Sequence, residues 1–197
     1  MKLDAPGLSV ANVRLDPICE AHRPVLAGAG AIEAMWRWMP MMERGISFNT
    51  YFDQTQQDYR DGHMVPFAIT RTTDGAFAGV VAFMNIVRLH RRLRIGYRWH
   101  PPEMRGGLLS AATSLALMQR ARDCRFQRIE FHVSVENKDA VAAIQRFGAA
   151  EEGVLRHYMR AANGLWADVA VFSLVTTEID RTIDSLTAHV EALAAKA

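Results

Sequence analysis

The fold is decided by the stretch IGYRWHPPEMRGGLLSAA, residues 95–112. The strand formers that lead up to Trp99 stop at Pro101-Pro102, because proline lacks the amide hydrogen that a strand ladder needs. Apolar residues then recur at helical spacing to about Arg122. Gly106-Gly107 therefore stands where a strand gives way to a helix N-terminus. The free amide hydrogens and the positive dipole end at such a point predict an anion-binding turn.

Strand and helix signals alternate along the rest of the chain. The predicted strands are residues 8–15, 65–71, 77–87, 93–99, 128–133, 154–160 and 166–175. The predicted helices are residues 50–60, 108–122 and 139–147, with Gly148 as the C-cap of the last, and a short helical region that Asp16-Pro17 opens and Gly28 and Gly30 close. Asp74-Gly75 and Asn163-Gly164 are turn dipeptides that predict two β-hairpins. The pattern is that of a mixed α/β fold.

The C-terminal segment carries one apolar seam. Its residues step by four, three, four and three: Ile179, Ile183, Leu186, Val190 and Leu193. The seam is too short for an independent coiled coil, so packing on the same chain is favoured over a homodimer contact. We expect one domain over residues 8–175, with an amphipathic helical extension over residues 176–197.

The composition excludes several classes of protein. The chain has 197 residues, 50% hydrophobic and 22% charged, which are globular proportions. A net charge of +2 gives no long-range field for DNA, and the longest uncharged stretch is too short to span a bilayer. No early apolar run resembles a secretory signal, so a cytoplasmic location is expected. Cys19 and Cys124 stand alone, which argues against a disulfide or a structural zinc site.

Several separated motifs occur in a characteristic order. They are Val13-Arg14-Leu15 with Pro17 and His22, Pro66-Phe67-Ala68-Ile69, the 95–101 stretch, Arg105-Gly106-Gly107, Asn137, Phe147-Gly148-Ala149, residues 152–156, and Asn163-Gly164 followed by Asp168 and Phe172-Ser173-Leu174. In this order they resemble the GNAT superfamily of acyl-CoA-dependent N-acyltransferases, in the branch of the RimJ/RimL type that acts on ribosomal-protein N-termini. The resemblance covers roughly residues 10–174.

The resemblance implies a GNAT fold, an α/β architecture with a mixed, mostly antiparallel central sheet, and acetyl-CoA or another acyl-CoA as the acyl donor. The diphosphate would lie on the glycine turn and the pantetheine arm between residues 97–101 and 128–133. The implied CoA-binding residues are Trp99 and His100 through their backbone, Arg105, Gly106, Gly107, Leu108, Leu109, Ser110, Ala111 and Asn137. No metal is implied. For Asn137, an N-cap of the following helix is the alternative.

The chain departs from the family pattern at several functional positions. Leu108 and Ser110 stand where the family motif has small residues, so the turn survives only if Leu108 does not need a positive φ. The proton-transfer positions of many relatives hold Arg94, Ala140 and Ile144 instead of glutamate, serine and tyrosine. The remaining catalytic candidates are Glu130, His132 and Tyr97, each of which could instead be an ordinary half-buried strand residue.

The acceptor is an amine, a peptide N-terminus by branch resemblance or a small molecule such as an aminoglycoside or polyamine. A basic group near the acceptor end favours acidic acceptors or is a solvated hairpin tip: Arg88, His90, Arg91, Arg92 and Arg94. A soft apolar group early in the chain could shape the acceptor pocket or join the core: Met35, Trp36, Trp38, Met39, Met41 and Met42. The rival functions are a CoA-binding module without catalysis and a protein-interaction domain.

Overall fold

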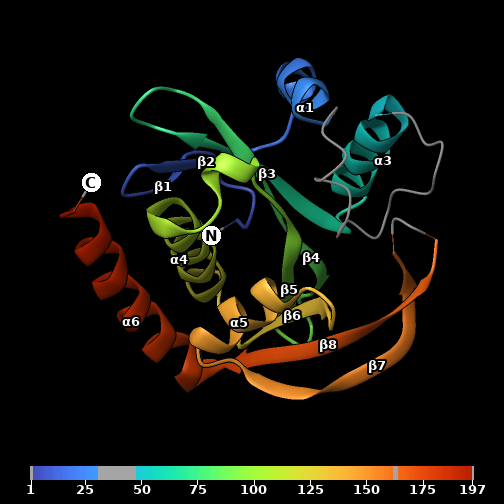
Figure 1. Ribbon diagram of the computed structural model, residues 1–197, viewed down its shortest axis with the longest axis vertical. Helices are drawn as coiled ribbons and strands as arrows, with labels where there is room; N and C mark the ends of the chain where they lie inside the picture. Colours follow the sequence, from blue (N-terminus) through green and yellow to red (C-terminus); the bar gives the residue numbers. More distant parts are fainter. Residues whose placement is uncertain (1, 31–47, 162–163, 197) are drawn as a thin grey trace.

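A single mixed sheet organises the molecule, with helices on both of its faces (Figure 1). The structure is a computed structural model that describes residues 2–30, 48–161 and 164–196. The strands are β1 Leu8–Val10, β2 Val13–Pro17, β3 Met64–Arg71, β4 Phe77–Val87, β5 Arg92–Trp99, β6 Arg128–Ser134, β7 Ala150–Arg160 and β8 Trp166–Val175. Their order in the sheet is β1-β2-β3-β4-β5-β6-β8-β7, and β5 with β6 is the parallel pair among antiparallel ones. The predicted mixed, mostly antiparallel sheet is confirmed.

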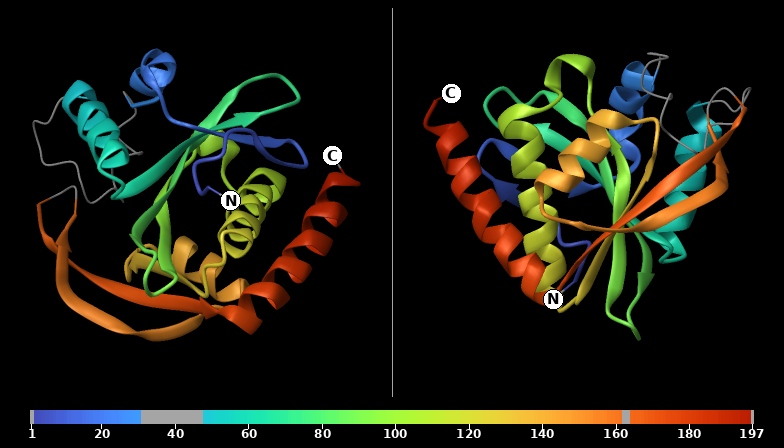
Figure 2. Two further views of the ribbon diagram at one scale, coloured as in Figure 1. Left: turned by 180° about the vertical axis from the view of Figure 1, so that it is seen from behind. Right: turned by 60° about the horizontal axis from the view of Figure 1, so that its bottom comes forward.

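The helices divide between the two faces of the sheet (Figure 2). They are α1 Arg23–Gly30, α3 Phe48–Arg60, α4 Gly107–Asp123, α5 Lys138–Arg146 and α6 Thr176–Ala194, with short 3-10 turns η1 Glu20–His22 and η2 Pro102–Met104. The larger buried cluster joins α4 and α6 to one face, with Leu117 and Ile129 fully buried in it. The smaller cluster joins α1 and α3 to the other face through Phe52. It contains no residue of β6, β7 or β8.

The N-terminal segment differs from the prediction. Residues 8–15 do not form one strand: β1 and β2 make a hairpin, because Ala11 adopts a left-handed φ of 49° and reverses the chain at Ala11-Asn12. No glycine or proline marks this turn, so the alternating pattern reads as continuous. Asp16 does not cap a helix; its carboxylate accepts hydrogen bonds from the Gly7 amide at 2.8 Å and from Arg14 Nε at 2.7 Å. The helical region starts later, with η1 and α1.

The other predicted elements are present with shifts of a few residues at their ends. The hairpin of β3 and β4 turns at Asp74-Gly75, and β7 pairs with β8 as expected. Asn163, predicted in the second turn, lies outside the described residues. So does the apolar group of Met35, Trp36, Trp38, Met39, Met41 and Met42. Among the described helices, none is long and apolar enough to cross a membrane.

The C-terminal helix packs on the same chain, as the seam predicts. In Figure 1 and both views of Figure 2, α6 lies alongside α4. Ile179 and Ile183 are 1% and 3% exposed and belong to the same buried cluster as Leu117 of α4. Burial of such side chains contributes roughly 1.5–3 kcal/mol each to folding. The apolar face of α6 is therefore buried against α4.

Candidate active site

The parallel strands β5 and β6 pair over only part of their length. Their register runs from Arg92↔Arg128 to Arg94↔Glu130 and then ends. Beyond Arg94, β5 continues along β4 while β6 continues along β8. At about 3.3 Å per residue, the unpaired part of β5 from Ile95 to Trp99 is roughly 16 Å long. Its backbone groups on the β6 side are thus available to an extended ligand, at the position predicted from the sequence.

A β-bulge bends β5 in the middle of this unpaired part. Between the pairs Val80↔Trp99 and Ala82↔Gly96, β5 has one residue more than β4, and Tyr97 has a φ of 56°. The bulge depends on Gly79 of β4: a Cβ there would stand 1.9 Å from the Trp99 carbonyl oxygen. Bulges increase local twist and bend the strand that carries them. The bulge thus lies in the part of β5 that no longer pairs with β6.

The glycine turn opens α4 as an uncapped helix N-terminus. Gly106 is the N-cap residue with φ 76°, and no side chain caps the helix there. Gly107 has φ 55°, and a Cβ at either glycine would meet nothing within 4 Å. The first amide hydrogens of α4 are therefore orphaned and approachable, with the positive end of the helix dipole behind them. This donor set fits a diphosphate.

Leu108 does not disturb the turn. It lies in the first turn of α4, is absent from the residues with positive φ, and packs its side chain against the main core. Leu108 therefore does not need a positive φ, which was the condition for an intact turn. Leu109 and Ala111 are buried on the core side of α4, so of these two residues only the backbone could reach a ligand.

Two arginines lie at the same end of β5. Arg105 is exposed and donates from Nε to the His100 carbonyl oxygen at 3.2 Å. Arg98 points to the α4 face and donates to the Ser110 carbonyl at 2.6 Å, to Ser110 Oγ at 3.0 Å and to Ser114 Oγ at 2.8 Å. Burial lowers the pKa of Arg98 to about 10, so it is still a cation at pH 7. Its charge adds to the positive potential of the helix N-terminus.

Sequence reasoning did not find the role of Arg98. The signal was present, because Ser110 and Ser114 are four residues apart and so share one face of α4. The bulge at Tyr97, however, changes which face of the sheet each later residue of β5 meets. Because the sequence does not reveal the bulge, it could not predict which face of the sheet Arg98 lies on.

His100 is buried beside the glycine turn and held by two hydrogen-bond contacts. Its Nδ1 lies 2.7 Å from the Ala78 carbonyl oxygen, and its Nε2 accepts from Arg98 Nε at 3.2 Å. Because an arginine only donates and a carbonyl only accepts, the imidazole is neutral with its proton on Nδ1. Burial, together with the charge of Arg98, lowers the pKa of His100 to about 3. Trp99 is also buried, against Phe77 at 5.7 Å between ring centroids.

A neutral, buried His100 predicts a specific loss of stability in mild acid. Below pH 6.5 the unfolded chain protonates this histidine while the folded chain does not. The free energy of unfolding therefore decreases as the pH decreases, and the contribution of His100 is fully present only above pH 6.5. Between pH 7 and pH 5 the free energy of unfolding should fall by about 2 kcal/mol from this group. Urea titrations at pH 7 and pH 5 measure this loss in the wild type and in His100→Asn. The asparagine keeps a donor to the Ala78 carbonyl. Equal losses in both proteins would contradict the assignment.

The polar candidates Glu130 and His132 meet on the face opposite α4. Their neighbours Ile129, Phe131 and Val133 belong to the core with α4, and strand alternation points Glu130 and His132 to the other side. His132 Nε2 lies 3.6 Å from Glu130 Oε2. The structure thus brings two of the three catalytic candidates together at the point where β5 and β6 separate.

Arg94 joins this pair. Its Nη1 lies 3.1 Å from His132 Nδ1. Since arginine can only donate, Nδ1 accepts, and the proton of the neutral ring is on Nε2, facing Glu130. Burial, followed by the charge of Arg94, lowers the pKa of His132, against an opposing effect of Glu130. His132 is therefore neutral at pH 7, and in the free protein its Nδ1 lone pair accepts from Arg94.

Tyr97, the third catalytic candidate, lies apart from this pair. Its ring stacks on Tyr51 of α3 at 5.7 Å, and its hydroxyl lies 2.7 Å from Thr55 Oγ1. Burial raises the pKa of Tyr97 well above its ordinary value, so the phenol stays protonated. It belongs to the smaller core cluster with Trp99. A catalytic role for Tyr97 stays a prediction.

Asn137 is the N-cap of α5. Its side-chain oxygen accepts from the Ala140 amide at 3.3 Å, so the alternative of a helix cap is present in the structure, and Asn137 rather than Asp139 fills it. Capping uses the amide oxygen alone, and the NH₂ group keeps its donor capacity. The predicted contact of Asn137 with the pantetheine arm stays a prediction.

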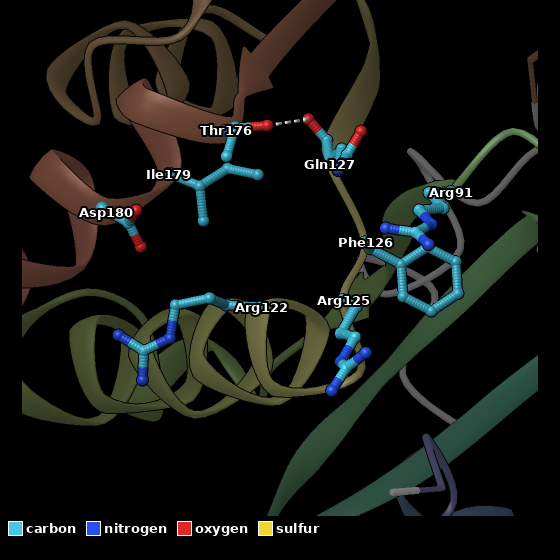
Figure 3. Close-up of a pocket in the computed structure, with 8 residues that line it drawn as sticks. All are labelled: Arg91, Arg122, Arg125, Phe126, Gln127, Thr176, Ile179 and Asp180. Atoms are coloured by element: carbon cyan, nitrogen blue, oxygen red, sulfur yellow. Dashed lines mark hydrogen bonds between the residues drawn. The ribbon is translucent and has the colours of Figure 1, made fainter.

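A separate cavity of about 210 Å³ lies at the other end of α4 (Figure 3). It is lined by Arg91, Arg122, Arg125, Phe126, Gln127, Thr176, Ile179 and Asp180. The 17 residues of α4 make it about 25 Å long, so this cavity is remote from the glycine turn. Figure 3 shows Thr176 of α6 bound to the Gln127 carbonyl, a contact of 3.5 Å between α6 and the segment before β6. The cavity is not part of the candidate active site.

The described residues thus provide two connected features. One is an uncapped helix N-terminus with added arginine charge, and the other is an open strand edge that leads from it to Arg94, Glu130 and His132. Among the described residues, no group of three or more histidine, cysteine or acidic side chains is arranged to hold a metal ion. The arrangement can bind a diphosphate with an extended tail and present the end of that tail to a neutral histidine.

The chain is similar to several known proteins. Residues 12–150 match the family "Acetyltransferase (GNAT) domain". A Bacillus subtilis protein, the uncharacterized N-acetyltransferase YoaA, is 29% identical over 137 residues, which cover 70% of this chain and 75% of that protein. Mycobacterium smegmatis RimJ in complex with CoA-disulfide has a similar structure, with a TM-score of 0.76, 23% identity and coverage of 89% of this chain and 88% of that one.

A second solved structure with the same fold is a spermidine N-acetyltransferase. Vibrio cholerae spermidine N-acetyltransferase, in complex with CoA and spermine, has a TM-score of 0.74 and 18% identity, and the match covers 86% of this chain and 99% of that one. At such identities the two structures support the fold alone. The family match covers most of the chain, and with the uncapped turn and the divided strands it identifies the protein as an N-acetyltransferase of the GNAT family.

Proposed function

We propose that the protein transfers the acetyl group of acetyl-CoA to a primary amine by direct attack, with His132 as the proton acceptor. The observation that carries the proposal is the meeting of Glu130 and His132 where β5 leaves β6, in line with the uncapped N-terminus of α4. The amides of Gly107, Leu108 and Leu109 would hold the diphosphate, and the open edge of β5 would hold the pantetheine arm. Acetyl-CoA supplies an activated thioester, whose carbonyl carbon accepts the amine.

The chain's own groups then manage charge and protons. The attacking nitrogen forms the C–N bond, the C–S bond breaks, and the thiolate of CoA leaves. The amine proton passes to His132 Nδ1 once Arg94 Nη1 has moved away from it, and Glu130 stabilises the imidazolium from the Nε2 side, at 3.6 Å in the free protein. Orientation and the donors of the unpaired β5 backbone could each contribute several kcal/mol to the rate. The protonated Tyr97 is a candidate donor to the leaving thiolate.

The acceptor within this class is a peptide N-terminus or a small amine. The likeness to RimJ supports the first and the likeness to spermidine N-acetyltransferase supports the second, both through the fold alone. The RimJ/RimL type of activity and a cytoplasmic location are also parts of this proposal that rest on the sequence. CoA-binding without transfer is the rival function, favoured by Ala140 and Ile144 at the usual proton-transfer positions.

Two measurements test the proposal. Calorimetry with CoA and acetyl-CoA should give saturable one-site binding, because the uncapped turn offers several convergent donors to one diphosphate. Thiol release from acetyl-CoA, measured with a panel of amino acids, peptides and polyamines, should then exceed release without an acceptor. Binding without acceptor-dependent release would support the rival CoA-binding module. An absence of binding near cellular CoA concentrations would leave an interaction domain.

A further inference from the structure

Arg94 is the basic side chain beside Glu130 and His132 that lacks an acidic partner among the described residues. Among the described residues, no carboxylate lies within 4.0 Å of its guanidinium, whereas the neighbouring arginines are paired. Arg128 contacts Glu130 and Glu152, each at 2.8 Å, and Arg92 lies 3.8 Å from Glu130. Glu130 and Glu152 are therefore already engaged by other cations.

The remaining contacts of Arg94 leave part of its donor edge without a strong acceptor. Nη1 donates to the neutral ring of His132 at 3.1 Å, and the acceptor of Nη2 among the described residues is the sulfur of Met84 at 4.0 Å. A thioether is a weak acceptor. A guanidinium normally binds a carboxylate through two parallel N–H groups, so Arg94 offers an incomplete site for an anion.

Arg94 lies at the place where the acceptor amine would meet the thioester. Arg94 is the last residue of β5 that pairs with β6, so it stands at the closed end of the unpaired stretch. A ligand arm that enters from the glycine turn ends near this point. Because α4 fills the other face, the amine has to approach from the face that carries Arg94 and His132.

We propose that Arg94 binds a carboxylate of the acceptor, so that the substrate is an amine with an acid group a few bonds from its nitrogen. This inference rests on the proposed acetyl transfer and narrows its substrate class to amino acids and peptides that begin with Asp or Glu. A half-buried cation without an acidic partner repels a second cation at short range, which disfavours polyamines. The carboxylate also draws Arg94 away from His132 Nδ1 and frees that lone pair for the amine proton.

The experiment compares acids with their amides, and each kcat/KM is expressed per neutral amine because the carboxylate also changes the pKa of the amine. Thiol release is measured with Asp-Ala-amide against Asn-Ala-amide, with alanine against alaninamide, and with spermidine, in wild type, Arg94→Gln and Arg88→Gln. Arg88 is exposed on the same hairpin, so its variant removes an equal charge outside the site. The two matched pairs separate a side-chain carboxylate from an α-carboxylate.

Wild type should favour one acid over its amide by at least tenfold in kcat/KM, since a hydrogen bond to a charged group contributes about one to two factors of ten. Arg94→Gln should reduce that preference to about twofold and raise the activity on spermidine, while Arg88→Gln changes neither ratio. The preference should also weaken at high ionic strength.

The results separate this inference from the proposal beneath it. Equal use of acid and amide by wild type, or an unchanged preference in Arg94→Gln, overturns the role of Arg94 and leaves acetyl transfer standing. Acetyl-CoA binding without transfer to any acceptor overturns acetyl transfer and the inference together. If Arg94→Gln does not fold, the wild-type ratios and Arg94→Lys decide the matter: the lysine should keep part of the preference through its charge, and a full loss would contradict the proposal.

Discussion

Gly107→Glu is expected to reduce the affinity for CoA at least a hundredfold while the chain stays folded. Gly107 is the first residue of α4, and a side chain there would project into open space in front of the orphaned amides. A carboxylate at that point would occupy the donors and repel the diphosphate. Loss of two charge-assisted hydrogen bonds at about 1.5 kcal/mol each corresponds to more than two factors of ten in the dissociation constant.

The strain of the substitution requires its own control. Gly107 has φ 55°, where a residue with a Cβ is disfavoured by about 1–2 kcal/mol. Gly107→Gln has the same shape and the same strain without the charge, so it should lose much less CoA affinity than Gly107→Glu and unfold at the same urea concentration. Calorimetry on both variants gives the comparison. Equal affinities in the two variants would remove the electrostatic argument, and wild-type affinity in both would remove the turn from the binding site.

His132→Asn is expected to lower kcat by roughly a hundredfold or more, with little change in CoA affinity. General base catalysis typically contributes 10²–10⁴ in rate. The asparagine oxygen can still accept from Arg94, so the position of Arg94 is preserved while the titrating group is lost. His157→Asn is the matched control, because His157 stacks on Trp166 and has no contact with the pair of Glu130 and His132.

The pH profile distinguishes a base from a merely structural histidine. Burial and Arg94 lower the pKa of His132 below its ordinary value of 6.5. A base has to be unprotonated, so wild-type activity should be lost only as the pH falls below 6.5, and His132→Asn should lack this limb. Steady-state rates between pH 5 and pH 9, with an acceptor of known pKa, make the comparison. An unchanged acidic limb in His132→Asn would assign it to another group.

Local signals were enough for the elements that build the cofactor side of the site. Pro101-Pro102 ends β5, and Gly106-Gly107 opens α4 with positive φ at both glycines. These features depend on the backbone preferences of the residues themselves, which a sequence displays directly. The position of Leu108 inside the first helical turn was the one condition that required coordinates.

Features that depend on a second strand were not predictable in the same way. The bulge at Tyr97 needs Gly79 to make room for the Trp99 carbonyl, and nothing near Tyr97 in the sequence announces this contact. The bulge places Tyr97 in the core beside α3 and Arg98 under α4. The first hairpin was missed for a simpler reason, since Ala11 is an unusual residue for a left-handed turn.

On the acceptor side too, some features could be predicted from local sequence and others depend on a second strand. Alternation along β6 predicted that Glu130 and His132 share a face, and their 3.6 Å approach follows from it. The contact of Arg94 with His132 crosses from β5 to β6 at the last paired position, so it depends on the register between two strands far apart in sequence. Only that register distinguishes Arg94 from the exposed arginines of the same hairpin.

A crystal structure of the protein with bound CoA tests the central claim most directly. We predict the diphosphate oxygens within hydrogen-bond distance of the amides of Gly107, Leu108 and Leu109, and the pantetheine arm along β5 from Trp99 toward Arg94. CoA bound elsewhere, for example in the cavity at the far end of α4, would contradict the account. So would a diphosphate on the turn with an arm that runs outside the gap between β5 and β6.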